Sequence, residues 1–256
     1  MKKSVTDIVT NGLCIGCGLC ESLAEAGSLK MMMTAEGRLR PSELNSLKSE
    51  FVDSIYQTCP GTQIHGLPEE EITSKTTVDP VWGPLIKVDR GYAADPDIRF
   101  RGSTGGVLTA LAIYLLESQR VEFVAHVAAD PEAPMRTKPH LSRTRADVLK
   151  AAGSRYGPAA PLQHFVQLLD LESPFAFVGK PCDISAIRNL AKIDPRVNRY
   201  CLYLLTLVCG GASELTKSQF VLEDFGLDED ELTLFRYRGY GNPGKTRIET
   251  KDGRAF

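Results

Sequence analysis

The stretch Cys14-Ile-Gly-Cys17-Gly-Leu-Cys20 carries the most specific pattern in the sequence. Three cysteines at this spacing, followed by a remote Cys-Pro pair, are typical of loops that bind a cubane iron–sulfur cluster. The remote pair here is Cys59-Pro60. Gly16 and Gly18 favour the same interpretation, because a loop wrapped around a cluster needs positive φ angles and N–H groups close to sulfur. The sequence therefore predicts one [4Fe-4S] cluster, with the ligands Cys14, Cys17, Cys20 and Cys59.

Zinc is the alternative metal, since it also accepts four thiolates. Zinc sites usually place their cysteines in two separated C-x2-C pairs, whereas this chain has one evenly spaced run and one distant Cys-Pro. The spacing favours the cluster. A zinc-binding interaction module without redox activity stays open as an alternative of another class.

Composition limits the other classes of function. The chain has 256 residues, of which 43% are hydrophobic, enough for one large core or for a small domain attached to a larger one. A net charge of -2 gives no basic surface for nucleic acid. The longest apolar runs are well short of the ~20 residues that span a bilayer, and the N-terminus lacks a secretory apolar region. Seven cysteines, grouped by metal-type spacing, favour a reducing compartment. We expect a cytoplasmic protein that has no transmembrane segment and binds no nucleic acid.

Two regions follow one another along the chain. Residues 1–66 are expected to form a ferredoxin-like module, and the polar, proline-containing residues 67–84 a linker. Within the module the pattern predicts a helix over 21–26, a strand over 29–33 with its turn at 35–38, and a helix over 44–56.

From residue 85 strands alternate with helices, which indicates an α/β domain with a mixed, mostly parallel sheet. Strands are expected at 85–92, 121–127, 175–178 and 200–209, and helices at 105–118, 146–152, 161–170, 183–191 and 214–225. Residues 234–256 have the pattern of a β-hairpin. The sequence stops at Phe256 without a closing helix, so the domain 85–256 is expected to continue in the natural protein. The fold class is α/β, or α+β when the module is included.

Three loops of this domain have residues suited to a ligand. In the first, glycines at the start of a helix and hydroxyl donors can bind an anion; its residues are Arg101, Gly102, Ser103, Thr104, Gly105 and Gly106. The alternative is an ordinary N-cap, in which Ser103 or Thr104 satisfies the first turn.

The second loop, Ser154-Arg155-Tyr156, follows a helix that is expected to end at Gly153. Arg155 and Tyr156 suit contact with a phosphate and an aromatic ring, and the alternative is a helix stop. The third loop, Lys180-Pro181, leads from a buried strand into a helix, at the strand end where ligands of open α/β sheets bind.

Two further cysteines, Cys182 and Cys209, come just after predicted strand ends. Cys182 stands at a helix N-terminus, which is expected to lower its pKa and suits a metal ligand or a redox thiol. Both residues can equally be small buried hydrophobic side chains. Cys201, at the start of a strand, is expected in the core.

The same motifs, in this order, resemble the coenzyme F420 hydrogenase/dehydrogenase beta subunit family. They are the cysteine run, Cys-Pro, Arg-Gly-Ser-Thr-Gly-Gly, Gly-Ser-Arg-Tyr, Gly-Lys-Pro-Cys-Asp, Cys-Gly-Gly and Arg-Tyr-Arg-Gly-Tyr-Gly-Asn-Pro-Gly. The resemblance implies that residues 102–106 and 154–156 line an FAD, with Lys180 and Pro181 close to it. It also implies that Cys182 and Cys209 can be ligands of a second cluster, completed by a later C-x2-C. No cysteine follows Cys209 in this chain.

The resemblance implies an iron–sulfur flavoprotein oxidoreductase. FAD exchanges electrons in pairs or singly, so a flavin beside a [4Fe-4S] cluster connects a hydride carrier, such as coenzyme F420, to a one-electron protein partner. That partner is expected to be a ferredoxin or a larger oxidoreductase subunit. The alternative enzyme is a ferredoxin-dependent reductase of an organic substrate. The sequence does not single out catalytic residues.

Overall fold

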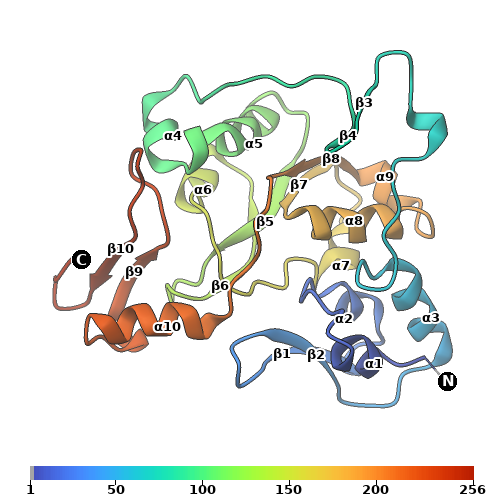
Figure 1. Cartoon of the computed structure of the whole chain (residues 1–256), viewed down its shortest axis with the longest axis horizontal. Coiled ribbons are helices and arrows are strands. Elements are labelled where there is room, and N and C mark those ends of the chain that lie inside the picture. The colour runs from blue at the N-terminus through green and yellow to red at the C-terminus, as the bar shows by residue number, and fades with distance from the viewer. Residues whose placement is uncertain (1–2) are drawn as a thin grey trace.

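A four-stranded sheet lies at the centre of the computed structural model, which describes residues 3–256 (Figure 1). Its order is β6-β5-β7-β8. Parallel pairing joins β5 (Phe123–Ala129), β7 (Phe175–Gly179) and β8 (Cys201–Thr206), while β6 (Thr137–Ser142) runs antiparallel to β5 at the edge. This confirms the predicted α/β class with a mixed, mostly parallel sheet. Of these four strands, only β6 is absent from the predicted strands.

Helices cover both faces of this sheet, because the apolar residues of its central strands point to both sides. Phe123 and Phe177 belong to one core, which includes Leu190. Val124 and Ala176 belong to a second core on the opposite face. The first core includes residues of α7 (Phe165–Leu169), α8 (Pro181–Leu190) and α9 (Arg196–Tyr200), and the second includes residues of α5 (Val107–Glu117) and α6 (Arg145–Lys150).

The N-terminal module lies at the lower end of the view in Figure 1. It contains α1 (Val5–Thr10), α2 (Leu19–Leu23), the antiparallel pair β1 (Leu29–Met33) and β2 (Leu39–Glu43), and α3 (Ser49–Thr58). Residues 1 and 2 of the predicted module lie outside the described residues. The predicted start of the second helix at Leu44 is wrong. The backbone N–H of Leu44 instead donates to the carbonyl of Ser28, so residues 44–48 continue from the hairpin.

The module shares a core with the α/β domain. Cys17 and Leu19 are buried in the same apolar cluster as Phe123. The hydroxyl of Ser22 in α2 accepts the backbone N–H of Val166 in α7 at 2.8 Å. The two regions are thus joined by direct packing as well as by the connecting chain.

The connecting chain has some regular structure of its own. It contains the short helical turn η1 (Glu69–Glu71) and a hairpin of β3 (Thr77–Asp79) and β4 (Gly83–Leu85). The predicted strand over residues 85–92 is wrong beyond Leu85. Ile86 and Val88 are 74% and 76% exposed, so their alternation does not reflect pairing in a sheet. A short helix, α4 (Pro96–Arg101), follows. Its N-cap Asp95 accepts the N–H of Asp97 at 2.8 Å.

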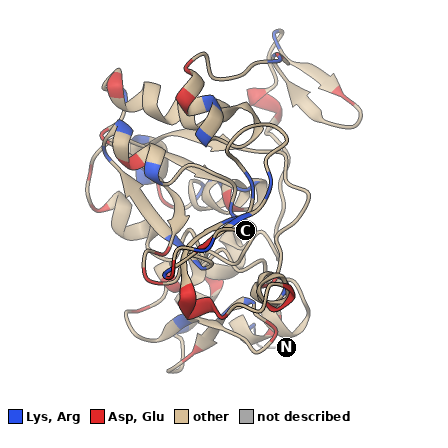
Figure 2. Ribbon diagram, turned by 90° about the vertical axis from the view of Figure 1, so that its left-hand side faces the viewer, with Lys and Arg blue, Asp and Glu red and all other residues tan. Residues whose placement is uncertain are grey.

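The C-terminal part contains α10 (Leu215–Asp224), the turn η3 (Glu229–Glu231), β9 (Leu232–Arg236) and β10 (Arg247–Thr250). The last two strands pair antiparallel, as the sequence predicts for a hairpin. Basic and acidic residues are both scattered over the ribbon between longer uncharged stretches (Figure 2). Within residues 3–256, none of the helices combines the length and the apolar character that crossing a bilayer requires.

Candidate functional site

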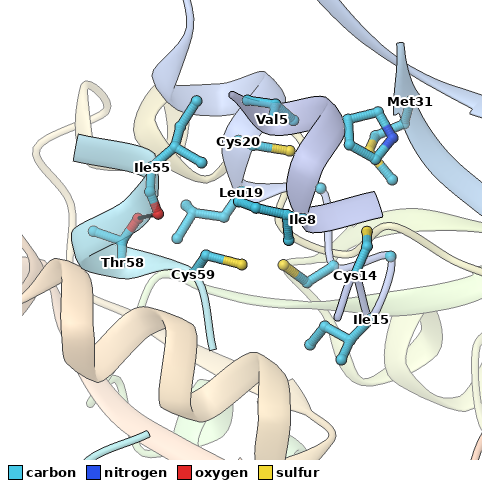
Figure 3. A pocket seen from close by; sticks show the side chains of 14 residues that line it. Val5, Ile8, Cys14, Ile15, Leu19, Cys20, Met31, Ile55, Thr58 and Cys59 are labelled. Carbon is cyan, nitrogen blue, oxygen red and sulfur yellow. Dashed lines mark hydrogen bonds between the residues drawn. The ribbon is translucent and has the colours of Figure 1, made fainter. Parts of the chain in front are cut away.

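The four predicted cluster ligands line one pocket of the N-terminal module (Figure 3). Cys14 and Cys17 come from the loop before α2, Cys20 from α2 itself, and Cys59 caps the C-terminus of α3. The remaining wall is mainly apolar and comes from α1, α2, β1 and α3. It includes Val5, Ile8, Leu19, Met31 and Ile55.

Glycines allow the chain to close tightly around this pocket. Gly16 and Gly18 have φ angles of +73° and +85°, which a side chain rarely adopts. A Cβ on Gly18 would lie 3.0 Å from the backbone nitrogen of Gln163. A Cβ on Gly61, just after Cys59, would overlap the carbonyl oxygen of Leu13, next to Cys14. The two cysteine-bearing segments are therefore in backbone contact with each other.

The apolar surroundings disfavour free thiolates in this pocket. Burial, together with the neighbouring thiols, raises the pKa of Cys17 well above its usual range and that of Cys20 to about 12. Burial also raises the pKa of Cys59. Thiols in such a setting become ligands when a cationic group replaces their protons.

A single zinc ion and a cubane cluster place different demands on four thiolates. In the part of the chain that the structure describes, no three His, Cys, Asp or Glu side chains are arranged to hold a single metal ion. Zinc would draw four sulfur atoms to about 2.3 Å from one centre. In a cubane each thiolate binds a different iron, so the sulfurs stand further apart. Four thiols around one apolar pocket fit such a cluster.

The glycine-rich loop after α4 is also tightly built. A Cβ on Gly102 would lie 2.5 Å from the Cα of Gly106, and Gly105 and Gly106 have φ angles of +71° and +72°. The N-cap alternative for this loop is only partly right, because Ser103 stands at the N-cap of the turn η2 (Thr104–Gly106) but its side chain does not cap it. Across the described residues, neither Ser103 nor Thr104 accepts a side-chain cap hydrogen bond from the following helices, and the N-cap of α5 is Gly106.

Ser103 instead joins three segments that are far apart in the sequence. Its hydroxyl accepts the backbone N–H of Ser154 at 3.0 Å and donates to the carbonyl of Arg238 at 3.2 Å. The first two loops that the sequence singled out therefore do come together. The third segment is the connection between β9 and β10, residues 237–246, which the sequence offered only as a glycine-rich motif.

Arg236 lies at the meeting point of these segments. Its guanidinium donates to the carbonyl of Ala152 at 2.9 Å and to that of Arg101, and it stacks on the Tyr240 ring at 4.2 Å. Burial lowers the pKa of Arg236. Its buried Nε has no hydrogen-bond partner among residues 3–256.

The Arg155 side chain binds other parts of the protein, whereas its loop suggests contact with a phosphate. Its guanidinium points inward and donates to the carbonyls of Pro134, Met135, Arg136 and Phe235, at 2.8–3.0 Å, and to the Thr137 hydroxyl. It thus fastens β9 to the start of β6. Neighbouring Tyr156 meets Tyr237 edge to face, with 5.7 Å between ring centroids. Arg101 pairs with Asp97 on the surface.

Lys180 and Pro181 begin α8 at the carboxyl end of β7, as predicted. The Lys180 ammonium donates to the carboxylate of Asp183 at 2.7 Å, and Asp183 is 1% exposed. Burial lowers the pKa of Lys180, but the Asp183 carboxylate more than offsets this, so the net shift is upward.

The expectation of a low pKa for Cys182 is wrong, because burial and the adjacent Asp183 carboxylate raise it. Cys209 is partly buried, and its sulfur accepts the N–H of Gly211. Cys201 is buried in the core, as expected. A second-cluster role for Cys182 and Cys209 stays a prediction.

Ser103→Ala is expected to weaken flavin binding if the joined loops hold FAD. Losing the bridge to Ser154 and Arg238 removes about 1 kcal/mol, a factor of about five in Kd. Flavin titration by fluorescence measures this. Ser118→Ala is the matched control, since its hydroxyl donates only to the carbonyl of Tyr114 at an exposed helix end. Equal Kd values for the two variants would contradict the assignment.

Family models match most of the α/β region. The model for the N-terminal part of the coenzyme F420 hydrogenase/dehydrogenase beta subunit matches residues 89–167, and the model for the C-terminal part of the same family matches residues 173–256. The cysteine pocket lies before the first matched residue.

Curated relatives of this chain have names that refer to coenzyme F420. Coenzyme F420 hydrogenase subunit beta of Methanococcus voltae is 37% identical over 103 residues, covering 39% of this chain and 36% of the relative. F420-dependent formate dehydrogenase 1 subunit beta of Methanococcus maripaludis is 28% identical over 63% of this chain and 40% of its own length. Coenzyme F420-dependent sulfite reductase of Methanocaldococcus jannaschii is 24% identical over 90% of this chain and 36% of its own length. The chain thus spans less than half the length of these relatives.

A solved structure has a similar fold. A chain of the F420-reducing [NiFe] hydrogenase complex from Methanosarcina barkeri superposes with a TM-score of 0.51 at 23% identity, covering 64% of this chain and 57% of that chain. At this level of identity the likeness concerns the fold.

Proposed function

Since the chain belongs to the coenzyme F420 hydrogenase/dehydrogenase beta subunit family, we propose that it is an iron–sulfur flavoprotein oxidoreductase. It transfers electrons between a coenzyme F420-type hydride carrier and a one-electron protein partner, through FAD and one [4Fe-4S] cluster. The relatives named as subunits of hydrogenase and formate dehydrogenase support a larger oxidoreductase subunit as the partner.

The observation that carries this proposal is the pocket lined by four cysteines in a module that packs against an α/β domain of this family. Cys14, Cys17, Cys20 and Cys59 would bind the cluster. The flavin would lie against the joined loops at Gly102–Gly106 and Ser154–Tyr156, with Lys180 and Pro181 at the neighbouring strand end. We divide the chain accordingly into a ferredoxin-like module 1–66, a connection 67–84 and a flavin-binding domain 85–256.

The protein residues supply position and charge for these groups. When bound, FAD exchanges two electrons with a hydride carrier and single electrons with an iron–sulfur cluster. The apolar wall of the cysteine pocket excludes water from the sulfur atoms, which helps to set the potential of a cluster. Arg236 adds a partly buried positive charge where the loops 102–106, 154–156 and 237–246 meet.

The test is anaerobic purification followed by cofactor analysis. We expect about four irons per chain, as one cubane contains, together with acid-released FAD. Adding reduced coenzyme F420 should bleach the flavin absorbance. Bleaching by reduced ferredoxin but not by reduced F420 would favour the organic-substrate reductase. A colourless protein that contains zinc would support the interaction module and refute the proposal.

Cys20→Ser should reduce the iron content to less than half of the wild-type value, because a cluster needs all four thiolates. Cys209→Ser is the matched control. Its sulfur lies outside the pocket, so the iron content should not change. A loss of iron in Cys209→Ser as large as in Cys20→Ser would contradict the assignment of the four pocket cysteines as the complete ligand set.

A further inference from the structure

Helix α8 connects the two candidate sites. Its first residues follow the Lys180-Pro181 loop at the sheet edge, and its last turn packs against α3, the helix that ends at Cys59 (Figure 1). One side chain in this last turn is polar and 4% exposed. It is Asn189, between the apolar residues of the core.

The Asn189 amide binds the loop that carries Cys59. Its Nδ2 donates to the carbonyl of Thr58 at 3.3 Å and to the carbonyl of Gln63 at 3.1 Å. Thr58 is the last residue of α3, whose final carbonyls have no partner within the helix. The amide group of Asn189 thus binds the carbonyls at both ends of the segment 58–63.

The rest of this segment is bonded within itself. The Thr62 hydroxyl shares its hydrogen between the carbonyls of Tyr56 and Cys59, at 2.8 and 2.9 Å, and the N–H groups of Thr62 and Gln63 donate to the Cys59 carbonyl. The turn is therefore internally rigid. Its anchor on the α/β domain is Asn189.

We propose that Asn189 is a positioning residue for the fourth ligand of the iron–sulfur cluster. Through two backbone carbonyls it fixes the direction in which α3 and its cap present the Cys59 sulfur to the pocket. It donates both hydrogens of one amide group, which a carboxylate of the same shape cannot do. This inference rests on the proposed function, because it takes Cys59 to be a cluster ligand.

Asn189→Asp on the full chain is the direct test, since it keeps the shape and replaces the NH2 group with a carboxylate oxygen, an acceptor that faces two carbonyl oxygens. Second-sphere changes of this kind typically weaken metal binding about 10–100-fold. We expect iron to be released to a chelator faster by about that factor, and the EPR spectrum of the reduced cluster to change. Flavin content should stay at the wild-type level.

Asn198→Asp is the matched control, because Asn198 is exposed on the next helix and the chemical change is identical. Its iron release and EPR spectrum should equal those of the wild type. If Asn189→Asp fails to fold, Asn189→Ser, which keeps one donor, should fold and release iron at a rate above the wild type. Wild-type iron release and an unchanged EPR spectrum in the folded Asn189 variant would overturn the proposal. A wild-type protein that binds no iron would instead refute the cluster itself.

Discussion

Gly61→Ala is expected to abolish cluster binding and to destabilise the N-terminal module. The added Cβ would overlap the Leu13 carbonyl oxygen, so the Cys59 turn must move away from the segment that carries Cys14. Overpacking against backbone typically costs about 1–3 kcal/mol of stability. Iron content and the midpoint of urea unfolding measure the two effects.

Gly66→Ala provides the control for this change. It lies five residues further along the same chain, and a Cβ there would meet nothing within 4 Å. Iron content and stability should both stay at wild-type values in this variant. A Gly61→Ala protein with a full complement of iron would show that the two segments do not need their backbone contact.

Arg155→Met is expected to have the largest effect on stability in the α/β domain. It removes the donors to four backbone carbonyls and to Thr137. Each buried acceptor left without a partner costs about 1–3 kcal/mol, and the carbonyls partly recover by binding water, so we expect a total loss of about 3 kcal/mol. Chemical denaturation followed by circular dichroism measures it.

Arg247→Met is the comparison. Its guanidinium pairs with Glu249 at the surface, so removing it should change stability by less than about 0.5 kcal/mol. If the two variants unfold at the same denaturant concentration, Arg155 does not fasten β9 to β6.

The cysteine pocket was predictable because its signal is local. Spacing alone places Cys14, Cys17 and Cys20 close together along the chain, and the Cys-Pro pair indicates the fourth cysteine of the pocket. The strands β5, β7 and β8 were also predictable, since buried parallel strands are continuous apolar runs. Helices α1, α4 and α9 were missed; they have five or six residues, too few to repeat an apolar face, and the equally short α2, α6 and α7 were predicted only with shifted bounds.

The features that sequence reasoning missed depend on tertiary contacts. Ser103 has the residue type of an N-cap, and only the approach of Ser154 and Arg238 shows that its hydroxyl joins loops. Arg155 lies in a loop suited to phosphate, but the carbonyls that it satisfies come from distant segments. Asn189 offered one weak signal, a polar residue among apolar ones near the end of a helix. Its partners lie more than 120 positions earlier in the chain.

The contacts between the N-terminal module and the α/β domain limit how this protein can be recombined. The Cys17 carbonyl accepts the N–H of Leu162, Ser22 receives the N–H of Val166, and Asn189 closes the Cys59 turn. If residues 1–66 were replaced by a ferredoxin segment from an unrelated protein, the Leu162 and Val166 N–H groups and the Asn189 amide would lose these partners. This holds for any junction within residues 67–84. We expect the two parts to be inherited together, and functional chimeras to require that both sides of each contact come from one parent.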